Sequence, residues 1–140
     1  MKKLILVLVV LSIGTLCFFQ FKKEPYTLIQ DYRKTNSDEF KYFGNEVDQD
    51  LNNDGVVDTA FIATQEVSGQ TSFYLIGAIK KDGGYLLTKS FLIGENISPQ
   101  TTERMEGGVV INFAIGSNPS IGKSLRLELN SKTLEFVEKL

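Results

Sequence analysis

The stretch Val57–Ile79, VDTAFIATQEVSGQTSFYLIGAI, decides which fold the sequence predicts. Its two halves are rich in β-branched and aromatic residues, which favour strands. Ser68-Gly69-Gln70 lies between them and is typical of a tight turn. The second half, Thr71–Ile79, is a nearly continuous apolar run of the kind found in a central strand. The stretch therefore predicts two adjacent strands joined by a turn.

The same pattern extends over the rest of residues 40–140. Glycines of predicted turns occur at positions 55, 69, 83, 94 and 107, every 11 to 14 residues, without an internal sequence repeat. This spacing is typical of consecutive antiparallel strands. We therefore expect an all-β domain, an antiparallel meander that forms a small sandwich or open barrel of about seven or eight strands.

An acidic loop, residues 50–58, immediately precedes the second of these strands and reads DLNNDGVVD. Oxygen-bearing side chains occupy loop positions 1, 3, 5 and 9, and the backbone carbonyl of position 7 is available, as in calcium-binding loops. The predicted ligands of a structural Ca²⁺ ion are Asp50, Asn52, Asp54, the Val56 carbonyl and Asp58. Gly55 permits the sharp turn that this geometry needs. No lysine or arginine between Glu46 and Ile79 offsets the carboxylates.

The loop departs from an EF-hand at position 12, where Phe61 replaces the bidentate glutamate and a strand replaces the second helix. Asp48, Glu46, another loop or water would have to supply the missing ligand. Two alternatives stay open. Asn-Asn-Asp-Gly also favours a hairpin turn without any metal, and another hard cation would use the same oxygens.

Composition excludes several functions. The chain has no histidine and no tryptophan, and its single cysteine is Cys17. A disulfide framework, histidine- or cysteine-based zinc sites, and serine–histidine or cysteine–histidine catalysis are therefore excluded. After Lys23 there remain 11 Lys and Arg against 17 Asp and Glu, with no basic patch, so we expect no nucleic-acid partner.

A hydrolase with a carboxylate pair is the alternative function, because it needs neither histidine nor cysteine. Its candidate residues near turns are Glu66, Glu95, Glu103 and Glu106. No spacing singles out a pair among them. We therefore predict no catalytic residues.

Residues 1–23 predict a signal-anchor that crosses the membrane once. Lys2 and Lys3 precede an uncharged apolar run from Leu4 to Phe21, which spans roughly 27 Å as a helix, close to the thickness of a bilayer core. A signal cleaved after Ser12-Ile13-Gly14, a poor match to the small-residue cleavage motif, and a lipoprotein attached through Cys17 are the alternatives. All three place the remainder outside the cytoplasm.

Residues 24–39 predict a polar tether. Its large apolar residues are Tyr26, Leu28, Ile29 and Tyr32. Pro25 and the cluster at 34–37 limit any regular element. We expect the Tyr26–Tyr32 part to be able to dock on the domain, as a helix or as a strand.

The loop DLNNDGVVD followed by an apolar strand resembles the calcium loops of FG-GAP and VCBS-type extracellular repeats, which also lie between strands. A longer resemblance, to uncharacterised bacterial envelope β-domains, runs from Asp50 to about Ile115. It is carried by DLNNDGVVDTAFIATQ, SGQTSFYLIGAIKKDGGY and FLIGENI. The resemblance implies an extracytoplasmic location and this architecture, without any chemistry. We therefore expect a membrane-tethered, calcium-stabilised module of the cell envelope with a binding or structural role, whose partner is an envelope protein or glycan.

Overall fold

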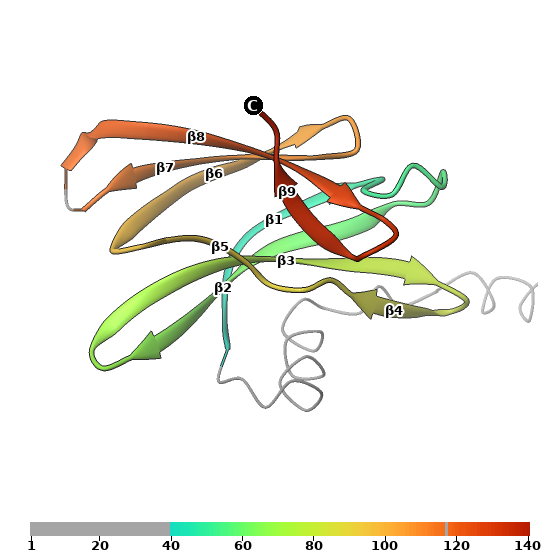
Figure 1. Ribbon diagram of the computed structural model, residues 1–140, viewed down its shortest axis with the longest axis horizontal. Helices are drawn as coiled ribbons and strands as arrows, with labels where there is room; N and C mark the ends of the chain where they lie inside the picture. Colours follow the sequence, from blue (N-terminus) through green and yellow to red (C-terminus); the bar gives the residue numbers. More distant parts are fainter. Residues whose placement is uncertain (1–39, 117) are drawn as a thin grey trace, which may run out of the picture.

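The computed structural model describes residues 40–116 and 118–140, which form nine strands and no helix (Figure 1). The strands are β1 (Lys41–Gln49), β2 (Asp58–Val67), β3 (Gln70–Lys81), β4 (Gly84–Leu87), β5 (Phe91–Glu95), β6 (Ile97–Met105), β7 (Gly108–Ile115), β8 (Asn118–Asn130) and β9 (Glu135–Glu138). Every strand pair is antiparallel, so the predicted all-β antiparallel fold is confirmed.

The segments predicted as anchor (1–23) and tether (24–39) lie outside the described residues. Within those that are described, no helix is long and apolar enough to cross a membrane.

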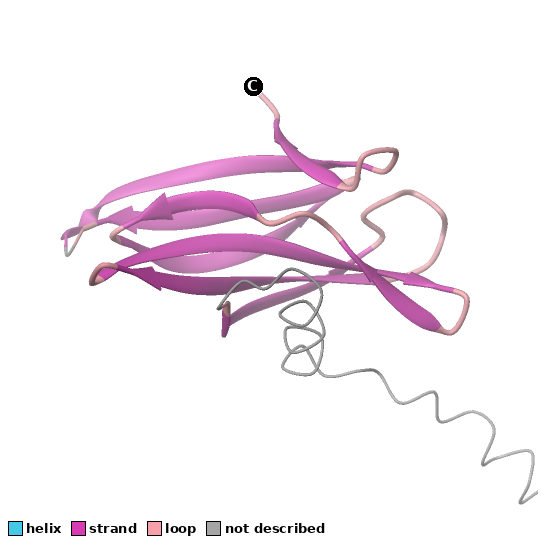
Figure 2. Cartoon of the chain, turned by 60° about the horizontal axis from the view of Figure 1, so that its bottom comes forward, coloured by secondary structure: helices cyan, strands magenta, loops and turns pink. Residues whose placement is uncertain are grey.

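The strands form two sheets that lie face to face as a sandwich (Figures 1 and 2). Sheet A has the order β1-β2-β3-β4, with β5 also paired to β3, and sheet B has the order β6-β7-β8-β9. The predicted hairpin is the centre of sheet A, where Thr59 to Val67 pair in unbroken register with Ala78 to Gln70. Ser68 and Gly69 both have positive φ, 53° and 79°, as a two-residue hairpin turn requires.

Between the predicted turn glycines at positions 83 and 94 the chain forms two short strands, β4 and β5, instead of one, so there are nine strands instead of about seven or eight. β4 pairs with Ala78–Lys81 and β5 with Ser72–Leu75, both antiparallel and both on the edge of β3 opposite β2. Thr88 keeps the backbone at the interruption attached to β3. Its N–H donates to the Gly77 carbonyl at 2.9 Å, and its hydroxyl oxygen accepts from the Gly77 N–H at 2.8 Å.

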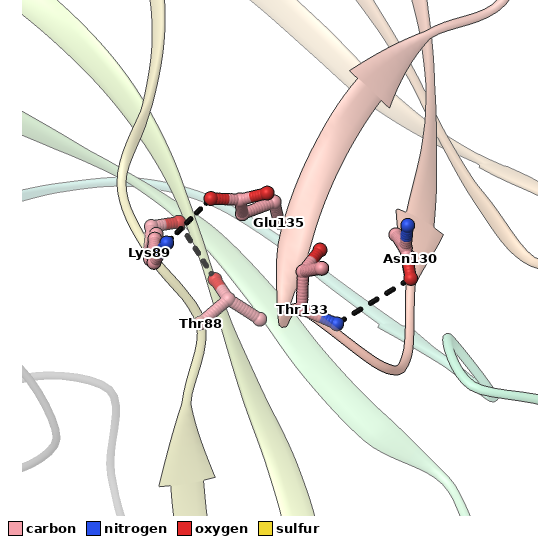
Figure 3. Close-up of polar contacts among 5 residues, drawn as sticks. All are labelled: Thr88, Lys89, Asn130, Thr133 and Glu135. Atoms are coloured by element: carbon pink, nitrogen blue, oxygen red, sulfur yellow. Dashed lines mark hydrogen bonds and ion pairs between the residues drawn. The ribbon is translucent and has the colours of Figure 1, made fainter.

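At this interruption Lys89 contacts the β8–β9 hairpin of sheet B (Figure 3). The Lys89 N–H donates to the Leu134 carbonyl at 2.9 Å, and the Lys89 ammonium lies 2.5 Å from the Glu135 carboxylate. Hydrogen bonding from Lys89, and less so from Thr133, holds the pKa of Glu135 below its ordinary value. Both side chains of the pair are exposed, so we expect the backbone bond to contribute more to joining the sheets.

The main core fills the space between the sheets. Strand alternation sends every second residue of β2 and β3 into it, such as Ala60, Ile62 and Leu75, all fully buried. Sheet B contributes Val109, Ile111, Phe113, Leu127 and Phe136. Phe136 lies against Gly77, where an added Cβ would come within 3.2 Å of its ring.

Sheet A also carries a second buried cluster, on the face turned away from sheet B. Its buried members are Phe40, Phe61, Ala63, Ile76 and Ala78. On β2 and β3 these residues alternate with those of the main core, and they pair across the strands, as Phe61 does with Ile76. Sheet A is therefore apolar on both faces.

Candidate functional site

The acidic loop connects β1 to β2 at one end of sheet A. Its backbone bends at Asn53 and Gly55, whose φ values are 58° and 84°. Asparagine and glycine tolerate this left-handed region better than other residues do. The two residues therefore set the shape of the turn.

The predicted ligand side chains fold inward over their own backbone. The two oxygens of Asp50 accept the N–H groups of Asp54 and Gly55, at 3.1 and 2.8 Å. Asn52 Oδ1 also accepts from the Asp54 N–H, at 3.1 Å, and Asp54 Oδ1 accepts from Val56, at 2.8 Å. The Asn52 amide donates to Asp54 Oδ2 at 2.9 Å. The structure thus brings together Asp50, Asn52 and Asp54, three of the predicted ligands.

Asp58, the fourth predicted side-chain ligand, is turned into the protein and fully buried. Its Oδ2 accepts the Leu51 N–H at 2.9 Å, and its Oδ1 accepts the Lys80 N–H at 2.8 Å. Leu51 is itself 1% exposed and belongs to the main core. Asp58 therefore fastens the start of the loop to the sheet.

The electrostatics of Asp58 follow from this position. Burial raises the pKa of its carboxyl above the ordinary value, and the negative charges of Asp54 and Asp50 act in the same direction. The two backbone N–H donors oppose the shift. Among the described residues no lysine or arginine forms an ion pair with Asp50, Asp54 or Asp58. Within the described residues, no ion pair therefore offsets the negative charge of the loop.

The donor set suits a hard cation, because all of its side-chain acceptors are carboxylate or amide oxygens. An ionised carboxylate oxygen that accepts one N–H retains capacity for a second contact. The side chains do not form a closed cage, however. In the part of the chain that the structure describes, no three acidic side chains gather closely enough to hold a metal. The oxygens of Asp50, Asn52 and Asp54 are engaged in turns of the loop's own backbone.

The upstream residues considered as further ligands are engaged within sheet A. Asp48 lies on β1 opposite Thr59 and accepts a hydrogen bond from its hydroxyl at 2.8 Å. Glu46, also on β1, accepts a hydrogen bond from the Tyr42 hydroxyl.

The four candidate hydrolase carboxylates lie in different surroundings. Glu66 forms an ion pair with Lys41, Glu95 accepts from Gln70, and Glu103 accepts from Asn112. Glu106 lines a different feature, a hollow beside the acidic loop. No hydrogen bond joins any two of these four glutamates within the described residues.

The sequence did not predict this hollow or its link to the acidic loop. It has a volume of about 610 Å³ and is lined by Asn53, Met105, Glu106, Gly107, Arg126, Glu128, Leu129 and Lys139. Asn53 lies so close to Gly107 that a Cβ on that glycine would approach its amide to 3.2 Å. The loop therefore rests on the β6–β7 turn of sheet B. No local pattern signals a contact between residues so far apart in the sequence.

The fold and the loop define the class of protein as a two-sheet antiparallel sandwich with an acidic loop between its first two strands. Comparisons with protein families, with curated proteins and with solved structures each find no match to this chain.

Proposed function

We propose that this chain is a membrane-tethered module of the cell envelope whose acidic loop binds a structural Ca²⁺ ion on the extracytoplasmic side. The observation that carries the proposal is the clustering of Asp50, Asn52 and Asp54 next to the buried Asp58. Among the described residues, no lysine or arginine forms an ion pair with these aspartates. The signal-like residues 1–23 support the location.

Asp50, Asn52, Asp54, the Val56 carbonyl and Asp58 would hold the ion. When bound, Ca²⁺ supplies the positive charge that the loop lacks and joins several oxygens with bonds of about 2.3–2.6 Å. The protein's own contribution is to keep the loop in place. Asp58 does so by binding Leu51 and Lys80, and Asn53 does so by lying against Gly107.

The energetic effect of such an ion is large on the scale of a small domain. If the dissociation constant is ~10 µM and free Ca²⁺ is ~1 mM, binding stabilises the folded state by roughly 2.7 kcal/mol. Total unfolding free energies of small domains are about 5–15 kcal/mol. We infer that calcium stabilises the fold and that the outer surfaces perform the binding or structural role, toward an envelope protein or glycan.

Isothermal titration calorimetry on the full chain in detergent tests the binding directly. We expect one Ca²⁺ per chain and an affinity at least about tenfold weaker for Asp54→Asn, because affinity depends on the number of charged ligands. The matched control is Asp82→Asn, which removes the same charge from another Asp-Gly turn. Equal affinities for the two variants, or no heat of binding in the unaltered chain, would contradict the proposal.

A further inference from the structure

The face of sheet A that points away from sheet B is buried, although no described element lies over it. Phe61 and Ile76 at its centre are 0% exposed, as are Ala63 and Ala78 around them. Sheet B cannot cover these side chains, because it packs on the opposite face (Figure 1). Residues of one strand that differ by an odd number point to opposite faces.

The composition of this face is suited to a covering layer of the same chain. Its centre combines the large Phe61 and Ile76 with the small Ala63 and Ala78, which leaves room for side chains from above. Tyr42, Tyr74 and Tyr85 are partly buried around it. A single layer of neighbouring side chains leaves the tops of the central residues open to water, so zero exposure requires a further layer.

The chain that precedes β1 reaches this face directly. Phe40, the first described residue, is 2% exposed and belongs to the same cluster. Its ring stands edge-on to Tyr74, with 5.0 Å between the ring centroids. The described part of the chain therefore begins at the apolar face itself. The large apolar residues of the preceding segment, residues 24–39, are Tyr26, Leu28, Ile29 and Tyr32.

We propose that residues 24–39 are an integral third layer of the domain, in which Leu28 and Ile29 cover Phe61 and Ile76 on the outer face of sheet A. Sixteen residues span about 24 Å as a helix and more when extended, enough to cross four strands about 4.8 Å apart. The segment predicted as a tether thus holds the domain close to the membrane anchor. This inference does not depend on calcium binding.

Photocrosslinking on the full chain in native membranes tests which partner covers the face. Tyr74, at the rim of the face, is replaced by p-benzoyl-phenylalanine. The membranes are irradiated, and the peptides crosslinked to this position are identified by mass spectrometry. We expect crosslinks within one chain to peptides of residues 24–39. Crosslinks to a second copy, to lipid or to another protein, or the absence of crosslinks to residues 24–39, would overturn the proposal.

Cysteine labelling tests the role of the two apolar residues. In a Cys17→Ser background, a maleimide is applied to Ala63→Cys on the outer face and, as a matched control, to Ala60→Cys in the main core. Both alanines are 0% exposed and lie on β2. Without further substitutions, both cysteines should react slowly. Leu28→Asp combined with Ile29→Asp should accelerate labelling of Ala63→Cys at least about tenfold and leave Ala60→Cys unchanged.

Thr27→Asp, a polar change in the same segment, should accelerate neither cysteine. The proposal fails if Ala63→Cys reacts quickly in the otherwise unaltered chain, or stays protected in the double aspartate variant. If both cysteines react quickly in the double aspartate variant, that variant has unfolded. The photocrosslinking experiment then decides alone, because it is done without the two aspartate substitutions.

Discussion

Asp58 accepts a hydrogen bond from the backbone N–H of Lys80, at 2.8 Å, although the two residues are 22 positions apart. β2 begins at Asp58, and its regular pairing with β3 begins one residue later, between Thr59 and Ala78. The Asp58 side chain therefore supplies an acceptor beyond the point where the ladder ends. Its other oxygen binds the Leu51 N–H, so one carboxylate joins the acidic loop, β2 and β3.

Replacing Asp58 by alanine should destabilise the domain even without metal. The substitution leaves two backbone N–H groups without their acceptor, at a cost of about 1–3 kcal/mol for each one that stays buried. Urea unfolding with a chelator present in every sample measures the loss. Asp54→Ala is the control, because Asp54 is exposed and should cost at most about 1 kcal/mol as a turn residue. An equal loss in both variants would show that Asp58 does not anchor the loop.

The buried Asp58 should also make the metal-free stability depend on pH. Burial raises its pKa in the folded state above the ordinary 3.8, so the folded protein binds this proton more readily than the unfolded chain. Its contribution to the unfolding free energy should therefore fall as pH rises from about 3.8 through the folded pKa. The measurement is the stability difference between wild type and Asp58→Asn, from urea unfolding in chelator between pH ~4 and ~7. Other titrating groups, including Glu135, affect both proteins equally and drop out of this difference. We expect the difference to decline with rising pH. An increase would contradict a raised pKa for Asp58.

Gly77→Ala should loosen the contact between the sheets. A Cβ at this position would approach Thr88 Cγ2 to 2.9 Å and the Phe136 ring to 3.2 Å. Crowding of this kind costs about 1–3 kcal/mol, which thermal unfolding can measure. Gly122→Ala is the control, since it lies on β8 with nothing within 4 Å of an added Cβ. If Gly122→Ala is the more harmful substitution, the packing at Thr88 and Phe136 is not as described.

The location of the domain can be tested with reporter fusions after Leu140. A reporter active only outside the cytoplasm should give signal, and a reporter active only in the cytoplasm should not. The opposite pattern would mean that Lys22 and Lys23 reverse the orientation that the signal-like start predicts.

Local sequence patterns predicted the hairpin of β2 and β3 because strand composition and turn glycines are both properties of neighbouring residues. The interruption at Thr88–Ser90 was not predictable, since it depends on Lys89 meeting Leu134 of the other sheet. β8 begins at Asn118, but of its first five residues only Asn118 and Gly122 pair with β7, with a shift in register between them that local composition does not reveal.

In the acidic loop, too, some features follow from neighbouring residues and others depend on distant contacts. Asp50, Asn52 and Asp54, whose spacing predicts calcium ligands, are joined by hydrogen bonds within one turn, and calcium binding itself stays a prediction. The spacing could not reveal that Asp58 is buried, since its partners are set by the end of the β2–β3 ladder. The continuous apolar run of β3 likewise indicates a strand that is apolar on both faces, but it does not reveal what covers each face.

The most direct test of the calcium account is the melting temperature of the full chain with and without chelator. If Ca²⁺ joins the loop, the chelator should lower the melting temperature by about 10–20 °C, the shift that corresponds to roughly 2.7 kcal/mol in a domain of this size. Millimolar Ca²⁺ should restore it, and Asp54→Ala should abolish the response. An unchanged melting temperature in chelator would contradict the account and identify residues 50–58 as a metal-free acidic turn.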